Sequence, residues 1–296
     1  MKTIWKLTAP SPQAATLSES SGLSPLEAQI LIHRGIADPH HVGSFLLPRL
    51  ANLLDPFLLK DMRDAVELTL SAMERHDPIT IYGDFDADGL TATALLFNFF
   101  SALGVPVHTY IPNRLTEGYG LHVRAVERIA RRGSGLIITV DCGVANNQEI
   151  AFAANLGLKV VVTDHHQVEE GFTPLCPVVN PQRADCPFPY KHLTGVGLAF
   201  FLAVALRAAL RERGAFAGRP EPDLKDYLDL VALGTVADMA PLVDQNRLLV
   251  KVGLDRIRTT QWPGIEAVSE LAGLTLDTLT AQDLAFRIAP RFNASG

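Results

Sequence analysis

The chain has 296 residues, and its composition is that of an ordinary globular protein. Hydrophobic residues make up 48% of it and charged residues 20%, which excludes disordered, collagen-like and disulfide-framework classes. It carries 26 Lys and Arg against 32 Asp and Glu, so the formal net charge is −6. A dedicated nucleic-acid binder usually has a basic surface, but a site built from cation-binding carboxylates adds to the same negative balance. The charge therefore does not exclude a nucleic-acid substrate.

Neither export nor membrane insertion is indicated. The first twenty residues contain no apolar segment of the signal-peptide type, and the longest uncharged run, 193–206, is shorter than the ~20 apolar residues of a membrane span. The three cysteines, Cys142, Cys176 and Cys186, form neither an even set nor a CxxC pair. We therefore expect free thiols, no zinc finger and a cytoplasmic location.

The chain begins with a segment, 1–22, that ends in a polar stretch and is expected to be a loose arm. Apolar residues then recur at helical spacing over 24–74, interrupted by prolines, which predicts a small helical region. From Pro78 onward, short apolar runs alternate with helical segments, as in βαβ units. The predicted domains are an N-terminal arm and helical region (1–77), a catalytic domain (78–245) and a helical connector (246–296).

The expected fold class is α/β, with a mainly parallel sheet flanked by helices. Each helix predicted between the strands is followed by a glycine, Gly104, Gly133 or Gly157, as a helix C-terminus favours. After residue 180 the pattern is helical throughout. The predicted strands are 79–82, 107–111, 136–140, 159–162 and 177–179, and the predicted helices are 91–103, 121–132, 147–156, 195–213, 223–233 and 246–258.

Acidic residues and histidines follow three of the predicted strands. The first strand runs into the sequence DFDADG at 84–89, the third into Asp141, and the fourth into Asp164-His165-His166. In open parallel sheets, ligands bind at the carboxyl ends of the strands. Carboxylates crowded at one edge repel each other unless protons or cations neutralise them. The pattern therefore predicts a divalent metal site.

The mixture of Asp and His ligands suits Mn²⁺ or Mg²⁺. Two such ions ~3.5 to 4 Å apart serve phosphoryl hydrolysis, and this is the reaction class that the residues indicate. Side chains alternate across a strand, so we expect only one of the adjacent histidines, His165, to be a direct ligand. His166 would then support it or bind the substrate phosphate, although both face the site if the backbone turns there.

Three simpler interpretations fit less well. The run at 84–89 also opens an EF-hand loop, but the twelfth position is Leu95 rather than Glu and the preceding segment is strand-like. Cys142 with His165 as base would make a thiol nucleophile, but the carboxylates around that cysteine raise its pKa. The Gly-Val-Gly run at 195–197 lacks the third glycine of a dinucleotide-binding motif, and no P-loop is present.

Short motifs follow one another along the chain at 82–89, 113–120, 140–143, 163–166, 180–181, 195–197 and 233–238. As a set they resemble the DHH phosphoesterase superfamily, and specifically its RecJ branch of single-stranded-DNA exonucleases. The resemblance runs from about residue 24 to the end. The last residues, 291–296, are similar to the start of the family's connection into a second, DHHA1, domain, so we expect the chain to be part of a longer polypeptide.

The resemblance implies roles for individual residues. Asp86, Asp88, Asp141 and His165 would be the main metal ligands, with Asp84, Asp238 and His166 completing or supporting the pair of ions. On the substrate side it implies Asn113, Arg114, Tyr119, Arg291 and Asn293. A guanidinium suits a phosphate and an aromatic ring suits a base, whereas a solvated arginine and a turn-packing tyrosine are the structural alternatives.

The implied function is metal-dependent 5′-to-3′ hydrolysis of single-stranded DNA to 5′-mononucleotides in DNA repair and recombination. The implied partners are single-stranded DNA and a helicase or single-strand-binding protein. One alternative is a DHH phosphoesterase acting on oligoribonucleotides, cyclic dinucleotides or pyrophosphate. Another is a non-catalytic scaffold like the RecJ relative in the eukaryotic replicative helicase. Such homologues tend to lose metal ligands, and the full set of carboxylates here favours a hydrolase.

Overall fold

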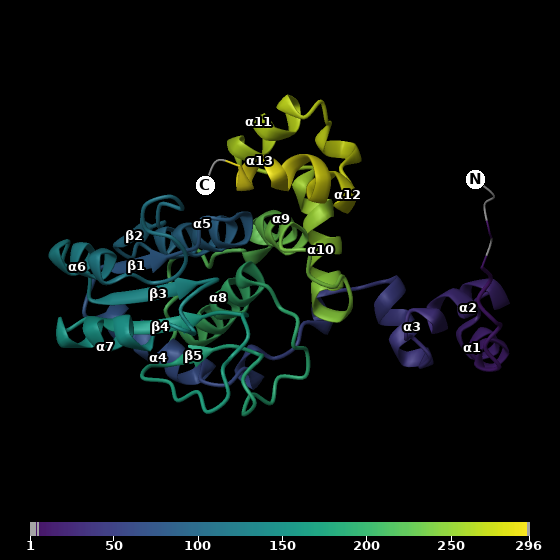
Figure 1. Ribbon diagram of the computed structural model, residues 1–296, viewed down its shortest axis with the longest axis horizontal. Coiled ribbons are helices and arrows are strands. Elements are labelled where there is room, and N and C mark those ends of the chain that lie inside the picture. Colours follow the sequence, from purple (N-terminus) through teal and green to yellow (C-terminus); the bar gives the residue numbers. More distant parts are fainter. Residues whose placement is uncertain (1–3, 5, 295–296) are drawn as a thin grey trace. The chain divides into compact units, whose positions relative to one another are not determined.

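The structure is a computed structural model that describes residue 4 and residues 6–294, and the chain divides into two compact units, Met1–Asn52 and Leu53–Gly296. The described part of the smaller unit is helical (Figure 1). Its core consists of Leu17, Ala28, Leu31 and Val42, which are contributed by all three of its α-helices. Its elements are α1 (Gln13–Ser21), α2 (Pro25–His33), α3 (Pro39–Leu46) and the short η1 (Leu50–Asn52).

The predicted loose arm is wrong for residues 13–21, which form helix α1. The helix ends at Gly22, whose φ of +72° is a conformation that glycine adopts easily, and the Gly22 N–H donates to the Ser18 carbonyl. Leu17 is buried against α2. So short a helix is marginal by itself and depends on this packing. Residues 1–3 and 5 of the predicted arm lie outside the described residues.

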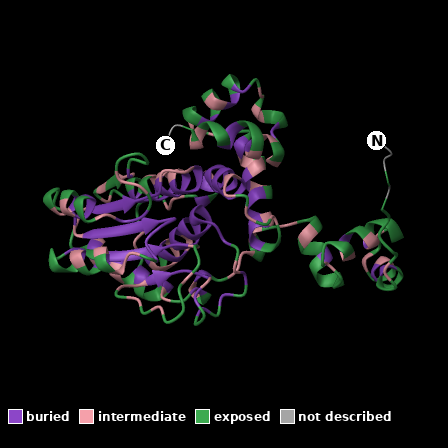
Figure 2. Ribbon diagram, viewed as in Figure 1, coloured by how far each residue is buried: buried purple, intermediate pink, exposed green. Residues whose placement is uncertain are grey.

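The larger unit is built on a five-stranded parallel sheet in the order β2-β1-β3-β4-β5. The strands are buried on both faces (Figure 2) except for the edge strand β2. The chain leaves β1 toward one edge of the sheet and later leaves β3 toward the other, so the strand order reverses between them. The predicted α/β class is confirmed. The strands are β1 (Ile79–Tyr82), β2 (Val107–Tyr110), β3 (Leu136–Val140), β4 (Lys159–Thr163) and β5 (Val178–Val179).

Helices cover both faces of this sheet. On one face, a hydrophobic core joins α6 (Val123–Arg131) and α7 (Asn147–Asn155) to strand residues such as Ile137 and Val160. The strand positions in between point to the opposite face, where α4 (Met62–Glu74), α5 (Ala87–Ala102) and α8 (Gly195–Glu212) contact the strands. Gly104, Gly133 and Gly157 follow α5, α6 and α7 with positive φ, as expected for helix ends.

The remaining elements extend the helical side of the larger unit. Helix α9 (Leu228–Ala237) packs on α5, α8 and α10 (Asp244–Ile257). In its second half, a Cβ on Gly234 would lie 2.9 Å from Asp88 Oδ1, at the start of α5. No helix among the described residues is long and apolar enough to cross a membrane. The domain boundaries at 77/78 and 245/246 stay predictions. The further elements are η2 (Pro56–Leu58), η3 (Leu224–Tyr227), α9 (Leu228–Ala237), α10 (Asp244–Ile257), α11 (Pro263–Leu271), η4 (Leu276–Thr278), α12 (Ala281–Asp283), η5 (Leu284–Ile288) and α13 (Ala289–Asn293).

Candidate metal centre

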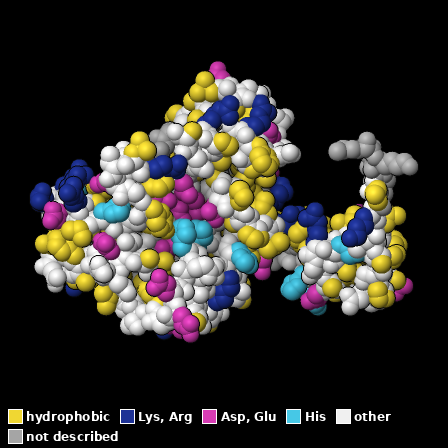
Figure 3. All heavy atoms as spheres, viewed as in Figure 1, with side chains coloured by type: hydrophobic (Ala, Val, Ile, Leu, Met, Phe, Trp, Pro, Cys, Tyr) yellow, Lys and Arg dark blue, Asp and Glu magenta, His cyan; other side chains and the backbone are white. Residues whose placement is uncertain are grey.

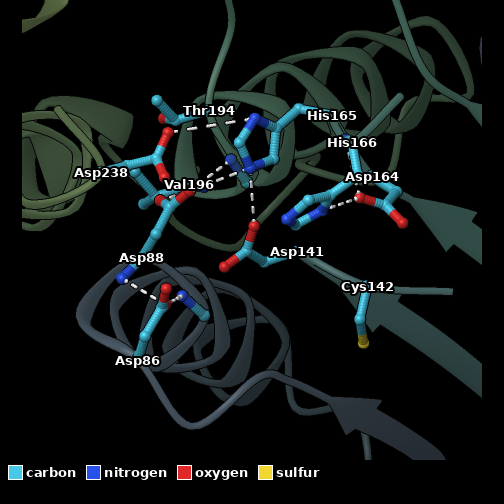
Figure 4. Close-up of polar contacts among 12 residues, drawn as sticks. Asp86, Asp88, Asp141, Cys142, Asp164, His165, His166, Thr194, Val196 and Asp238 are labelled. Carbon is cyan, nitrogen blue, oxygen red and sulfur yellow. Dashed lines mark hydrogen bonds and ion pairs between the residues drawn. The ribbon is translucent and has the colours of Figure 1, made fainter. Parts of the chain in front are cut away.

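The polar residues that follow β1, β3 and β4 meet at one edge of the sheet, at the point where the strand order reverses. This is where open α/β sheets place their ligands. Acidic and histidine side chains lie next to each other on this face of the larger unit (Figure 3). The close-up in Figure 4 shows Asp88, Asp141, His165 and Asp238 converging on a common space.

The loop after β1 and the first turn of α5 together supply three carboxylates, those of Asp84, Asp86 and Asp88. Asp86 is the N-cap of that helix, and its Oδ1 accepts hydrogen bonds from the Asp88 N–H at 3.0 Å and the Gly89 N–H at 2.9 Å. This cap begins α5 at Ala87, four residues before the predicted start. Asp84 is buried beside Gly89, where a Cβ would come within 2.6 Å of the Asp84 backbone. Only glycine permits this close approach.

The start of α8 holds the carboxylate of Asp88. The Gly195 N–H donates to Asp88 Oδ2 at 2.6 Å and the Val196 N–H donates to Asp88 Oδ1 at 2.8 Å. The positive end of a helix dipole stabilises a carboxylate at this position. The Gly-Val-Gly run, which matched no phosphate motif, thus orients a candidate metal ligand. A Thr194 N-cap before two glycines is the sequence signal for such an anion-holding helix start.

Asp141 directly follows β3. Its φ of +63° lies in the left-handed region, which Asp tolerates better than most residues. Its N–H donates to the Thr163 carbonyl at 3.0 Å, which ties the turn to β4. A Cβ on Gly195 would lie 2.5 Å from the Asp141 Cβ. Asp141 and the start of α8 therefore pack with no spare space between them.

Both histidines after β4 reach the site, because the strand ends at Thr163 and the alternation of side chains ends with it. Their ring centroids are 4.6 Å apart. His165 Nε2 lies 2.9 Å from Asp141 Oδ1 and 3.8 Å from Asp88 Oδ2, and His165 Nδ1 lies 3.9 Å from Asp238 Oδ2. His165 is thus surrounded by candidate ligands, as expected for a direct one.

Although the His165 and Asp141 side chains lie close together, they do not form an ion pair. Burial, followed by the charge of His166, lowers the pKa of His165 to about 4, so its imidazole is neutral at pH 7. Although the two atoms are 2.9 Å apart, neither His165 Nε2 nor Asp141 Oδ1 has a hydrogen-bond partner with suitable geometry. Buried polar atoms left in this way are costly, and a cation coordinated by both would satisfy them.

Asp164 supports His166 rather than facing the other carboxylates. Its buried Oδ1 accepts from the His166 Nδ1 at 2.7 Å and from the His166 N–H at 3.1 Å, while Oδ2 accepts from the Val144 N–H at 2.9 Å. The hydrogen bond that His166 donates to Asp164 raises the pKa of His166. Because Nδ1 is engaged, Nε2 remains for a cation or a substrate oxygen. Asp164 follows a predicted strand, but it is not among the expected site residues.

The carboxylates that converge here carry abnormal pKa values. Burial is the main cause of the rise to about 6 in the pKa of Asp84 and of Asp238, with the charge of Asp86 adding to both. Burial and the neighbouring carboxylates also raise the pKa of Asp88 and of Asp141. Acids crowded in this way need protons or cations, which is what the sequence pattern predicted for this edge of the sheet.

Three sets of ligand atoms lie close enough together to share a cation, with all atoms of a set within 4.8 Å of one another. Asp141 belongs to two of the sets and His165 to two. Sets that share ligands in this way fit a pair of neighbouring ions, and oxygen ligands with imidazole suit Mn²⁺ or Mg²⁺. The sets are Asp84, Asp86 and Asp141; Asp88, His165 and Asp238; and Asp141, His165 and His166.

The loop after β2 brings two of the expected substrate residues to the centre. The guanidinium of Arg114 lies 4.5 Å from the ring centroid of Phe85, which stands between Asp84 and Asp86 in the loop after β1. The hydroxyl of Tyr119 lies 3.0 Å from His166 Nδ1 and donates to the Asp141 carbonyl at 3.3 Å. Asn113 folds the loop itself, because its Oδ1 accepts from the Leu115 and Thr116 N–H groups.

The other two expected substrate residues lie on α13. Asn293 reaches the start of α5, where its Oδ1 accepts from the Ala87 N–H at 2.7 Å. The guanidinium of Arg291 donates to the Arg287 carbonyl in the preceding turn, and the side chain is exposed. The structure therefore brings Asn293 to the start of α5, whereas Arg291 makes no hydrogen bond or ion pair with residues 84–88 in the part of the chain that the structure describes.

Cys142 does not have the environment of a nucleophile. The thiol is fully buried, and burial together with the charges of Asp164 and Asp141 raises its pKa. Its Sγ lies 4.0 Å from the Tyr82 carbonyl. A reactive cysteine needs access and a lowered pKa, so Cys142 fills space in the core, as predicted.

A sequence profile described as "DHH family, N-terminal domain" matches residues 78–235, which is more than half of the chain. The chain belongs to the DHH family. Among curated relatives, this DHH chain is 38% identical over 293 residues to the single-stranded-DNA-specific exonuclease RecJ of Bacillus subtilis, covering 99% of this chain and 36% of that protein. It is 46% identical over 251 residues to RecJ of Dickeya dadantii, covering 83% and 44%.

Solved RecJ structures share the fold of this DHH chain. A crystal structure of exonuclease RecJ bound to manganese superposes with a TM-score of 0.71 at 42% identity, covering 83% of this chain and 59% of that one. RecJ from Thermus thermophilus in complex with Mn²⁺ superposes with a TM-score of 0.77 at 37% identity, covering 96% and 38%. The chain thus spans about two fifths of the length of the curated relatives given above.

Proposed function

We propose that this chain is the catalytic DHH part of a RecJ-type exonuclease that hydrolyses single-stranded DNA from the 5′ end to 5′-mononucleotides, in cytoplasmic DNA repair and recombination. The observation that carries the proposal is the meeting of Asp88, Asp141, His165 and Asp238 at the strand ends, with Asp141 Oδ1 and His165 Nε2 buried and lacking hydrogen bonds. The RecJ relatives support the same reaction.

Seven residues would form the metal centre and its immediate support. Asp84, Asp86, Asp88, Asp141, His165 and Asp238 would hold two Mn²⁺ or Mg²⁺ ions, and His166 would support the site from beside them. When bound, such ions activate water and neutralise the charge that develops on the phosphoryl oxygens. RecJ structures that contain Mn²⁺ support this choice of metal.

The chain's own residues would place the substrate against that centre. The Asp164 carboxylate holds His166 Nδ1, so a protonated His166 has its Nε2–H free to donate to a phosphate oxygen. Arg114, which is stacked on Phe85, supplies a planar donor on the same side. Tyr119 is 46% exposed, so its ring can stack on a base while its hydroxyl stays bonded to the Asp141 carbonyl.

Further parts of the proposal rest on the resemblance rather than on contacts. Asn113 would shape the loop that carries Arg114. Arg291 and Asn293, both on α13, would contact the DNA. The proposed domains are 1–77, 78–245 and 246–296, with the last leading toward a DHHA1 domain. The proposed partners beyond DNA are a helicase or a single-strand-binding protein.

The decisive experiment measures nucleotide release from a 5′-phosphorylated single strand by the purified chain with and without Mn²⁺. Asp141→Ala and His165→Ala should each lower the Mn²⁺-dependent rate by more than about 100-fold, because residues that only support metal ligands already contribute 10–100-fold. Cys142→Ala is the matched control, since the neighbouring thiol is buried and should be dispensable. Unchanged turnover in either ligand variant would contradict the assignment.

The same preparation separates the alternatives. An enzyme that cleaves a dinucleotide or cyclic dinucleotide and ignores a long single strand would be a small-substrate phosphoesterase. A chain that shows no Mn²⁺ binding in calorimetry would be a non-catalytic scaffold. The complete set of buried acids is the observation that favours a hydrolase over the scaffold.

A further inference from the structure

We propose that Asn293 is a positioning residue that completes the N-terminal cap of α5 and thereby fixes the carboxylates of Asp86 and Asp88. The proposal rests on the proposed function, because it assigns Asn293 a role toward the same metal centre. It starts from one contact across 206 positions of sequence, in which Asn293 Oδ1 accepts from the Ala87 N–H at 2.7 Å.

The backbone donors at the start of α5 show why this contact matters. The first N–H groups of a helix have no partner within the helix and need acceptors from elsewhere. Asp86 Oδ1 accepts from the second and third, Asp88 and Gly89, and the Asp86 carbonyl accepts from the fourth, Leu90. The first, Ala87, is left, and Asn293 supplies its acceptor.

The cap leaves one carboxylate oxygen of Asp86 able to bind a cation. Because Oδ1 of Asp86 is occupied by two backbone donors, its orientation is fixed and Oδ2 is left for a cation. The carboxylate of Asp88, in the same turn, accepts hydrogen bonds from two N–H groups at the start of α8. A loose Ala87 would let this first turn fray, and both carboxylates would lose their fixed positions.

An amide is also the suitable acceptor at this place. Asp84, Asp86 and Asp88 already crowd the turn, and burial and this crowding raise the pKa of Asp84 and Asp88. A neutral amide oxygen satisfies the N–H without adding a further charge. Since Oδ1 must face the donor, the Asn293 NH₂ group remains available as a hydrogen-bond donor toward a substrate.

The backbone before Asn293 sets its direction. The chain passes from α12 through a π-helical segment, Leu284–Ile288, into α13. A π turn holds about one residue more than an α turn, and one residue corresponds to about 100° of rotation. Ile288 and Ala289 are buried, and α13 contacts both α5 and α9. The wide turn thus helps to orient α13 so that Asn293 reaches α5.

The test compares Mn²⁺ affinity by calorimetry in the 296-residue chain and three variants. Asn293→Ala removes the acceptor and should weaken Mn²⁺ binding about tenfold, the scale of groups that orient ligands. Asn293→Asp keeps an acceptor oxygen, and its added negative charge attracts the cation once Mn²⁺ is present, so its affinity should stay within about threefold of wild type or be higher. Gln282→Ala, at an exposed position of α12, should bind as wild type does.

A second measurement does not depend on metal. Hydrogen exchange of the backbone amides at 87–90 should be faster in Asn293→Ala than in wild type, and restored in Asn293→Asp. The proposal is overturned if Asn293→Ala binds Mn²⁺ normally, if the Asp variant is as weak as the Ala variant, or if exchange at 87–90 is unchanged. If Asn293→Ala unfolds, the Asp variant decides by its affinity and exchange.

The two proposals fail in different ways. A wild-type chain that binds Mn²⁺ through an Asn293-dependent cap but releases no nucleotides from DNA would contradict the proposed function alone. Normal hydrolysis of DNA together with an Asn293→Ala variant that matches wild type in affinity and exchange would contradict the positioning role alone.

Discussion

At the scale of single residues, the buried Asp164 carboxylate determines what its neighbour His166 can do. Asp164 accepts from both the ring and the backbone of His166, and its other oxygen accepts from Val144. Burial would raise the pKa of Asp164, but the hydrogen bond and charge of His166 outweigh burial, and the net direction is down. The pair therefore resembles the carboxylate–histidine units that orient metal-bound or substrate-bound imidazoles.

We predict that Asp164→Asn lowers the rate of DNA hydrolysis by about 10–100-fold. An amide has one acceptor oxygen, so its NH₂ group must face either His166 or the Val144 N–H, both of which donate. The pKa of His166 should fall toward that of an ordinary histidine, and this is measurable by NMR titration of the imidazole. A variant whose His166 titrates as in wild type would show that Asp164 does not set the state of the ring.

Residue-level reasoning from the sequence found most of the acids but gave an incomplete account of the histidines. It favoured His165 as the direct ligand because side chains alternate along a strand. The structure brings His166 to the same space, since β4 ends two residues before His165. Whether a strand continues for two more residues depends on its neighbours, and a local pattern does not contain that information.

At the scale of elements, the start of α8 fits closely against the candidate metal centre. Its first two N–H groups hold Asp88, and its first residue packs on Asp141. One helix end therefore contacts two acids, Asp88 in the first turn of α5 and Asp141 directly after β3. The position of α8 in turn depends on α5 and α9, with which it packs over the sheet.

We predict that Gly195→Ala abolishes tight Mn²⁺ binding while Gly197→Ala preserves it. A Cβ at 195 would come within 2.5 Å of the Asp141 Cβ, so either Asp141 or the helix must move. A Cβ at 197 would approach the Thr194 hydroxyl at 3.3 Å, which a small shift accommodates. Both glycines have ordinary negative φ, so backbone strain is not a factor. Equal affinities of the two variants in calorimetry would contradict this role of α8.

At the scale of the whole molecule, the metal centre affects the stability of the fold. Four carboxylates with raised pKa values converge in the larger unit. In the unfolded chain an Asp ionises near pH ~3.9, whereas Asp84 and Asp238 ionise near 6 in the folded, metal-free protein. The folded state therefore holds more protons than the unfolded state over this interval, and folding loses free energy as the pH rises through it.

We predict that the metal-free chain becomes less stable as the pH rises from about 4 to above 6. The decline continues at higher pH because Asp88 and Asp141 also have raised pKa values. His166 acts in the same direction, since its raised pKa means that its stabilising contribution is lost as the pH rises through that value. Two groups with lowered pKa values act oppositely. His165, with a pKa of about 4, favours folding as the pH rises through this interval, but the four acids outnumber it. The lowered pKa of Asp164 costs stability only in stronger acid.

Denaturant titration in EDTA over this pH range measures the effect. Mn²⁺ at ~100 times its dissociation constant at pH 7.5 should add ~2.7 kcal/mol per site to the free energy of unfolding, and the same Mn²⁺ concentration should add less at pH 5.5, where protons compete for the carboxylates. A metal-free chain that is most stable at pH 7.5, or a stabilisation by Mn²⁺ that is independent of pH, would show that these acids are not the ligands.

The sequence by itself determined the sheet, its parallel class and the acids at three strand ends, because these depend on local periodicity and on residue types next to each other. It missed helix α1, whose few apolar residues have meaning only when packed on α2. The supporting contacts also escaped it: Asp164 on His166, α8 on Asp88, and Asn293 on Ala87.

These contacts join residues of quite different separation, and two of the three link positions more than a hundred residues apart. A hydrogen bond of this kind depends on where two helices or turns lie in space, which packing of the whole unit decides. The sequence therefore determines which residue types can bind a cation. Their orientation, their protonation state and the neighbours that hold them are decided only when the sheet and its helices pack together.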